Sequence, residues 1–305
     1  MTTLDSTAPP TRQSAPQKVD RDAIFYELTR SICPQCRRVI DAQILLRENK
    51  VYMRKRCPAH GVVEALVYGD AQAYTSSAKF NKPGTIPLVF SAEVARGCPH
   101  DCGLCPDHQQ HTCLGIIEVN SACNMSCPLC FADAGAGFNL ALEDVEEILD
   151  DFVRAEGHPE VVQFSGGEPS IHPQIIPMLR AAKARDIRHV MLNTNGKRLA
   201  TDDAFLAELA EIRPIIYFQF DGFERETYRV IRAAPDILPE KLRALDRLAE
   251  IGCSVILVPA IERGVNEHEV GRIVRFGLEH PAVKASTFSR PSTPAGTGRT
   301  TRCSA

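Results

Sequence analysis

Short apolar runs alternate with amphipathic segments over most of the second half of the chain. The apolar runs predict strands over 114–119, 161–164, 190–193, 215–220 and 254–259. Apolar residues at three- and four-residue spacing predict helices over 140–155, 173–184, 203–212, 237–251 and 267–279. Strands that alternate with helices are typical of a parallel sheet with crossover helices. The pattern therefore predicts an α/β fold over 114–285.

The first third of the chain follows another pattern. Two β-type runs, 40–46 and 51–55, flank a turn at 48–50. Such a pair predicts a hairpin, here within a small module over 23–70. Residues 71–113 show little periodicity and are predicted to connect this module to the parallel sheet.

Both ends of the chain are rich in small polar residues and proline. Residues 1–22 and 286–305 have few bulky apolar side chains and no periodicity, so they are predicted to be disordered. The second tail begins where a sixth strand is expected after 281–284. The sheet is therefore predicted to be incomplete at its last strand.

Composition and charge exclude several classes of protein. The chain has 305 residues, of which 44% are hydrophobic and 24% charged, enough for one large or two smaller domains. A net charge of −3 offers no basic field for nucleic acid. No apolar run is long enough to span a bilayer, and the N-terminus lacks the features of a secretory signal. We therefore expect a cytoplasmic location, no nucleic-acid partner and no transmembrane segment.

The chain has twelve cysteines, clustered at spacings typical of metal ligands, which favours metal binding in a reducing compartment over disulfides. The first cluster consists of Cys33, Cys36, Cys57 and His60, in C-x2-C-x20-C-x2-H spacing. Three thiolates and an imidazole form a closed tetrahedral site, which predicts a structural zinc or a mononuclear iron. Free core cysteines are the alternative interpretation.

A second cluster lies in the predicted connector. Its members are Cys98, Cys102, Cys105 and Cys113. Four thiolates saturate a cubane, so this cluster predicts an auxiliary [4Fe-4S] centre for electron transfer or structure. Zinc on mixed ligands is the alternative, because His100, His108 and His111 lie nearby in sequence.

A third cluster follows the predicted strand 114–119 directly. Cys123, Cys127 and Cys130 repeat the C-x3-C-x2-C spacing. Three cysteines leave one iron of a cubane without a protein ligand, so a substrate or cofactor can bind there. A structural zinc knuckle or a redox cysteine pair is the alternative.

Together with Ser165-Gly166-Gly167-Glu168-Pro169, this third cluster resembles the radical SAM superfamily. The resemblance implies a partial (β/α)6 barrel and a [4Fe-4S] cluster on the three cysteines. S-adenosylmethionine (SAM) would bind the open iron and, after one-electron reduction, give methionine and a 5′-deoxyadenosyl radical that abstracts hydrogen. An external donor such as ferredoxin or flavodoxin would supply the electron.

The ends of the predicted strands carry further candidates, because parallel α/β folds form their sites there. The candidate cofactor contacts are Gly166, Gly167, Glu168, Pro169, Asn193, Asn195, Gln219 and Asp221. By resemblance, the first four contact the methionine amino group, and Asn193 or Asn195 contacts the ribose or the methionine carboxylate. Simple turns at Asn195-Gly196 and Asp221-Gly222 explain these residues equally well.

The full set of motifs resembles the branch that contains archaeal tetraether lipid synthase and the methanopterin-pathway pterin methylase. The resemblance covers roughly residues 30–283 but not the C-terminal extension of that branch. We therefore expect a truncated chain, with a frameshift near Lys284 as the hypothesis.

The resemblance implies hydrogen abstraction from an unactivated C–H bond, for C–C bond formation on a lipid-like substrate. Methylation of a pterin-like small molecule is the alternative. From another class, a non-catalytic iron–sulfur electron carrier or an inactive truncated product stays open.

Overall fold

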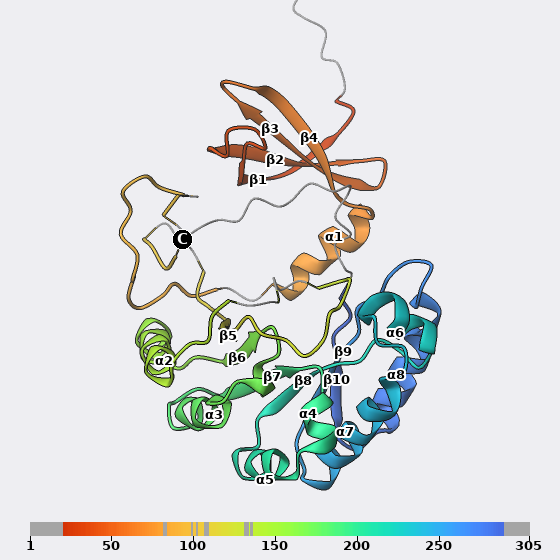
Figure 1. The fold of residues 1–305 in the computed structure, drawn as a ribbon. Coiled ribbons are helices and arrows are strands. Elements are labelled where there is room, and N and C mark those ends of the chain that lie inside the picture. The colour runs from red at the N-terminus through yellow and green to blue at the C-terminus, as the bar shows by residue number, and fades with distance from the viewer. Residues whose placement is uncertain are drawn as a thin grey trace, which may run out of the picture. The chain divides into compact units, whose positions relative to one another are not determined.

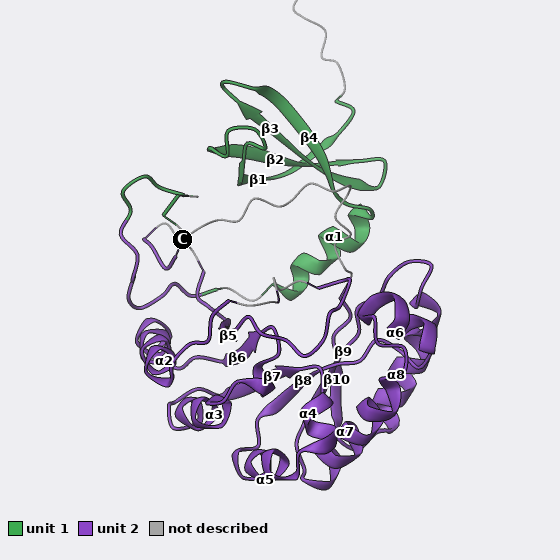
Figure 2. Ribbon diagram, viewed as in Figure 1, with its two compact units in different colours: residues 1–84, 94–102 green, residues 85–93, 103–305 purple. Residues whose placement is uncertain are grey.

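The computed structural model describes residues 21–81, 84–98, 100–101, 103–106, 110–130, 134 and 137–289. The chain forms two compact units, shown in different colours in Figure 2. The first consists of residues 1–84 and 94–102, and the second of residues 85–93 and 103–305. The predicted disorder of the two ends falls almost wholly outside the described residues.

The first unit contains a four-stranded antiparallel sheet in the order β1-β2-β3-β4. Its strands are β1 (Ile24–Ile32), β2 (Val39–Arg47), β3 (Lys50–Cys57) and β4 (Gly61–Tyr68). The predicted hairpin is β2–β3, with Leu46 opposite Val51. Its turn places Glu48 and Asn49 in the left-handed region, at φ 51° and 54°.

One helix, α1 (Ala71–Ser77), follows this sheet, with the short 3-10 helix η1 (Ala78–Phe80) after it. Asp70 caps α1, since its side chain accepts a hydrogen bond of 3.0 Å from the backbone N–H of Ala73. The apolar core here is small: among the described residues its two buried clusters are Ile44, Val51 and Ala71, and Cys33, Ile40 and Cys57.

The second unit is built on a six-stranded parallel sheet in the order β10-β9-β8-β7-β6-β5. The strands are β5 (Leu114–Asn120), β6 (Val161–Gly166), β7 (His189–Thr194), β8 (Ile215–Gln219), β9 (Val255–Val258) and β10 (Val283–Ser286). This order confirms the predicted parallel α/β sheet. Figure 1 shows the helices of this unit along the outer side of the curved sheet.

The helices that connect these strands are α2 (Leu142–Glu156), α3 (Ile175–Lys183), α4 (Lys197–Thr201), α5 (Asp203–Ile212), α6 (Arg225–Arg232), α7 (Leu238–Glu250) and α8 (Val270–Glu279), with the short 3-10 helices η2 (Pro169–Ile171) and η3 (Glu267–Glu269). Among the described residues, no helix is both long and apolar enough to span a membrane.

The last strand, which the sequence pattern left incomplete, is present as the short β10. It pairs in parallel with β9. Backbone bonds continue beyond it: the Thr287 N–H donates to Leu257 O, and the Ser289 N–H donates to Pro259 O. The sequence pattern did not predict this strand, because the segment carries few apolar side chains. Backbone hydrogen bonds to β9 hold it in the sheet. Residues 290–305 lie outside the described part of the chain.

Alternation along the strands separates the core of this unit from its site. In β6, Val162 and Phe164 are fully buried in the core shared with the helices, as are the alternate residues of the neighbouring strands. Ser165 of β6 and Asn193 of β7 stand at the opposite positions of the alternation and line a cavity. The fold thus keeps polar groups at the C-terminal strand ends on one side of the sheet.

Candidate active site and metal centre

A cavity of about 220 Å³ opens at the C-terminal ends of strands β5 to β8. The predicted residues that line it are Cys123, Cys127, Cys130, Gly166, Gly167, Glu168, Pro169, Asn193, Asn195 and Gln219. The structure therefore brings the third cysteine cluster and the Gly-Gly-Glu-Pro turn to one place. Asp221 is not among the lining residues.

Sequence reasoning missed some residues that line the same cavity, which include Glu118, Met125, Thr194 and Arg232. Strand register would have indicated Glu118, because it pairs with Ser165 across β5 and β6. Arg232 had no signal in sequence, because it ends α6, a helix that was not predicted.

The Gly-Gly-Glu-Pro turn is bound directly to the segment that precedes Cys123. The Gly167 N–H donates to Asn120 O at 2.8 Å, and the Glu168 N–H donates to Ala122 O at 2.9 Å. A Cβ at Gly166 would lie 2.1 Å from Asn120 O, and one at Gly167 would lie 2.3 Å from Ala122 O. Only glycine permits this close approach of two backbones.

The Glu168 carboxylate is buried and fully engaged by the protein. It accepts hydrogen bonds from Thr194 Oγ1 at 2.7 Å, from the Asn195 N–H at 2.7 Å and from the Ser170 N–H at 3.1 Å. The bonds from Thr194 and Asn195 join the end of β6 to the end of β7, and the bond from Ser170 caps the N-terminus of η2. The glutamate side chain therefore fixes the shape of the cavity wall.

Residues 123–130, which carry the third cysteine cluster and are called the cysteine loop below, are attached to the strand ends by a side-chain hydrogen bond. Asn195 Nδ2 donates to Asn124 Oδ1 at 2.7 Å. Burial raises the pKa of the Cys123 thiol, and the nearby Glu168 and cysteine charges add to this effect. Burial also raises the pKa of Cys127, but the Arg232 guanidinium opposes this. The thiols would therefore lose their protons on binding a metal centre.

Lys241 supports the cavity from beneath. Its Nζ donates to Asn195 O at 2.9 Å, to Gln219 O at 2.7 Å and to Gln219 Oε1 at 3.0 Å. Burial lowers the pKa of Lys241 to about 7. The lysine thus holds both Asn195 and Gln219 in place at the ends of β7 and β8.

Asp221 lies behind the cavity, fully buried. Its carboxylate accepts two hydrogen bonds of 2.8 Å from Arg232 and one of 3.0 Å from the Ala260 N–H. These contacts occupy the carboxylate, so the structure places it against Arg232 and not at the cavity surface.

The cavity fits an iron–sulfur cluster better than a single ion. Three thiols from one loop face a space bordered by glycine backbone. Among the described residues, Cys123, Cys127 and Cys130 do not form a group whose sulfurs all lie within 4.8 Å of one another. A four-iron cluster is larger than one ion, so its ligands stand farther apart than those of zinc.

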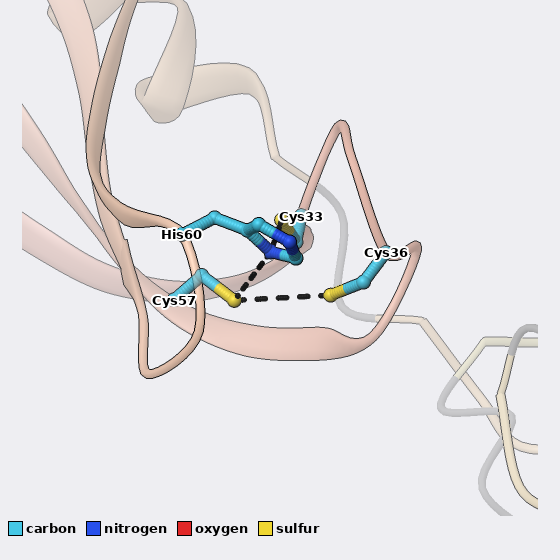
Figure 3. Close-up of side chains that lie close together, drawn as sticks. All are labelled: Cys33, Cys36, Cys57 and His60. Atoms are coloured by element: carbon cyan, nitrogen blue, oxygen red, sulfur yellow. Dashed lines mark hydrogen bonds between the residues drawn. The ribbon is translucent and has the colours of Figure 1, made fainter.

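The first cysteine cluster forms a compact group in the first unit (Figure 3). The ligand atoms of Cys33, Cys36, Cys57 and His60 all lie within 4.8 Å of one another. His60 Nδ1 is 3.4 Å from Cys57 Sγ and 3.5 Å from Cys33 Sγ.

The protein also supports the ionised form of a ligand in this group. A hydrogen bond from the Cys36 backbone N–H is the main cause that lowers the pKa of Cys33 to about 6. This arrangement, with three sulfurs and one nitrogen around one point, suits a closed metal site.

The auxiliary cluster stays a prediction. Cys98 belongs to the first unit, whereas Cys105 and Cys113 belong to the second. Cys102 and His108 lie outside the described residues.

Comparisons with known proteins agree with this geometry. A family model described as the radical SAM superfamily matches residues 117–277, more than half of the chain. A second model, described as the HMPTM N-terminal zinc ribbon domain, matches residues 25–69.

The chain is also similar to curated proteins. It is 37% identical over 257 residues to 7,8-dihydro-6-hydroxymethylpterin dimethyltransferase of Methanocaldococcus jannaschii, which covers 83% of this chain and 50% of that protein. It is 32% identical over 167 residues to GTP 3′,8-cyclase of Chlorobaculum tepidum, which covers 54% of this chain and 49% of that protein. The chain thus spans about half the length of these relatives.

Solved structures show the same fold. SuiB of Streptococcus suis bound to S-adenosylmethionine gives a TM-score of 0.51 at 12% identity, covering 88% of this chain and 65% of that chain. AdoMet-bound anSMEcpe gives a TM-score of 0.50 at 20% identity, covering 59% of this chain and 51% of that chain.

Proposed function

The chain belongs to the radical SAM superfamily, and from that premise we propose that it methylates a ring carbon of a pterin-like substrate. The observation that carries the proposal is the shared cavity of Cys123, Cys127, Cys130 and the Gly166–Pro169 turn. An open-iron cluster and a cofactor would meet at this place.

The three cysteines would hold a [4Fe-4S] cluster with SAM on its open iron. When bound, this pair supplies a 5′-deoxyadenosyl radical that removes a hydrogen atom from the substrate. A second SAM would supply the methyl group to the substrate carbon and, with one further electron from the same donor, leave as S-adenosylhomocysteine. The chain would bring the Gly166–Gly167 backbone close to SAM and offer the Asn193 and Gln219 amides as hydrogen-bonding groups. Lys241 would hold Gln219 through its bonds to both Gln219 oxygens.

The polar lining of the cavity favours a polar ring over a lipid chain. Besides the Asn193 and Gln219 amides, which are assigned to SAM, Glu118 and Ser165 bring a carboxylate and a hydroxyl to the cavity. The relatives named above carry a pterin or GTP in their names, and none carries a lipid. The lipid-like substrate and its C–C coupling therefore rank below pterin methylation.

The proposal includes further metals and a partner. Zinc would occupy Cys33, Cys36, Cys57 and His60, and an auxiliary [4Fe-4S] cluster would use Cys98, Cys102, Cys105 and Cys113. A low-potential one-electron carrier such as ferredoxin or flavodoxin would reduce the cluster, because SAM cleavage consumes one electron.

The test uses the anaerobically reconstituted full chain with SAM, a one-electron reductant and 7,8-dihydro-6-hydroxymethylpterin. We expect 5′-deoxyadenosine and a pterin in which one ring C–H is replaced by C–CH3, both detected by mass spectrometry. Cys127→Ala should abolish both products, whereas Cys253→Ala, at a buried thiol of the core, should retain them.

Two results would contradict the proposal. If 5′-deoxyadenosine forms but only GTP or a lipid chain is converted, the substrate is wrong. If iron is bound without any 5′-deoxyadenosine, the chain is an electron carrier or an inactive product.

A further inference from the structure

Arg232, the last residue of α6, reaches across the second unit to the cysteine loop. Its Nη1 donates to Leu129 O at 3.4 Å, and the residue lines the cavity together with Cys127. Among the described residues, no other arginine or lysine lines this cavity. A fixed positive charge therefore stands beside one of the three cysteines that would hold the cluster.

The position of this charge is set by a buried ion pair. Nε and Nη2 of Arg232 each donate to one Asp221 oxygen at 2.8 Å, and the side chains are 12% and 0% exposed. Asp221 itself is fixed by the Ala260 N–H at 3.0 Å and by Gln219 Nε2. Such a two-point contact leaves the guanidinium one orientation, with its remaining donors toward the loop.

The Arg232–Asp221 pair carries no net charge. The sign of the electrostatic potential that it produces at Cys127 therefore depends on which of the two side chains lies on the cavity side. Arg232 lines the cavity together with Cys127, whereas Asp221 is not among the lining residues. The side of the pair that faces the cluster is therefore positive.

We propose that Arg232 is a positioning residue that orients Cys127 and raises the reduction potential of the [4Fe-4S] cluster, with Asp221 as its anchor. This inference rests on the proposed presence of that cluster. Adding one electron to the cluster adds one negative charge, and a nearby cation and donors to the cluster sulfurs favour that charge. The electron comes from the same external one-electron donor.

The test is a redox titration of the reconstituted full chain in the absence of SAM, in which electron paramagnetic resonance monitors the reduced cluster. The signal of this cluster is identified in a parallel sample, because adding SAM changes it and leaves an auxiliary cluster unchanged. Iron content and circular dichroism check cluster loading and folding of each variant.

We expect Arg232→Met to lower the midpoint potential. At the potential that half-reduces the wild-type cluster, the ratio of reduced to oxidised cluster should fall at least tenfold, which corresponds to 59 mV for one electron.

The matched control is Arg185→Met, which removes a partly buried arginine of the same unit. Arg185, two residues after the end of α3, pairs with Asp150 of α2 at 2.7 Å and does not line the cavity. Its loss should leave the potential unchanged.

An unchanged potential in Arg232→Met with full iron content overturns the inference, even if SAM binds more weakly. If Arg232→Met does not load iron, Arg232→Gln replaces it as a neutral hydrogen-bond donor, and an unchanged potential there has the same meaning. A wild-type protein without any [4Fe-4S] signal would instead contradict the proposed function.

Discussion

Lys241 is a buried ionisable side chain next to the cavity-lining residues Asn195 and Gln219. The side chain is 1% exposed and donates three hydrogen bonds, all to oxygens of Asn195 and Gln219. Burial disfavours the charged amine and lowers its pKa to about 7, against 10.5 for an ordinary lysine. The folded chain therefore loses this proton at a lower pH than the unfolded chain does.

This difference predicts a pH-dependent stability. Between pH 7 and about 10, the Lys241 amine is protonated in the unfolded chain but not in the folded chain. The free-energy cost of burying this side chain on folding therefore decreases as pH rises. Relative to Lys241→Met, the wild-type free energy of unfolding should increase by about 1 kcal/mol per pH unit from pH 7.5 to 9.5. Urea titrations at several pH values measure it.

The control for this experiment is Lys183→Met, at an exposed lysine of α3. Its stability difference from wild type should stay constant over the same pH range. The same flat profile for Lys241→Met would mean that the folded chain keeps this amine protonated.

At the scale of elements, the turn between β6 and η2 determines where the cysteine loop begins. Gly167→Ala would place a Cβ 2.3 Å from Ala122 O and 2.5 Å from Ser121 O, so the segment before Cys123 must move. We expect iron content at this site and SAM cleavage to fall at least tenfold, a loss of about 1.4 kcal/mol in binding. Iron analysis and 5′-deoxyadenosine release measure the effect.

Gly271→Ala in α8 is the matched control, since a Cβ there meets nothing within 4 Å. Alanine favours a helix over glycine by about 1 kcal/mol, so this variant should be at least as stable as wild type. Equal iron content in the Gly167 and Gly271 variants would show that the turn does not position the loop.

Elements were predictable where apolar periodicity was strong. Strands β5 to β9 and helices α2, α3, α5, α7 and α8 follow from the pattern within a few residues. Helix α6 did not, because its sequence R-E-T-Y-R-V-I-R is mostly polar and buries only Thr227, Tyr228 and Ile231. Arg232 was missed with it. Strands β1 and β4 were missed because each presents exposed residues on both faces.

The cysteine loop and the turn of the candidate site were predictable from motif spacing, but the hydrogen-bond partners of its carboxylates were not. Glu168 and Asp221 both follow strands, which suggested cofactor contacts for each. The structure uses Glu168 to join β6 to β7, and Asp221 to hold Arg232. Such partners come from distant segments, and no local pattern in the sequence indicates them.

At the scale of the whole molecule, the two units depend on different sources of stability. The second unit has a large continuous core from its sheet and helices. The first has two buried clusters of three residues each among its described residues, and one of them includes Cys33 and Cys57 themselves. So small a core requires added stabilisation, which a metal at the Cys33–His60 cluster would supply.

Cys57→Ser should therefore unfold the first unit selectively. Structural zinc contributes about 10–16 kcal/mol in isolated zinc-finger peptides, more than this small core supplies. We expect bound zinc to fall from one per chain to almost none, and amide hydrogens in 24–68 to exchange rapidly while those in 114–286 stay protected. Zinc analysis and hydrogen exchange with peptide resolution measure both effects.

Cys253→Ala serves as the comparison, because it removes a cysteine from the core of the second unit. That variant should keep its zinc and the protection of 24–68. If Cys57→Ser also kept this protection, the sheet of the first unit would fold on its apolar contacts alone, and the metal would be incidental to its stability. Loss of protection in both units at once would instead mean that the second unit folds only with the first, which its own large core argues against.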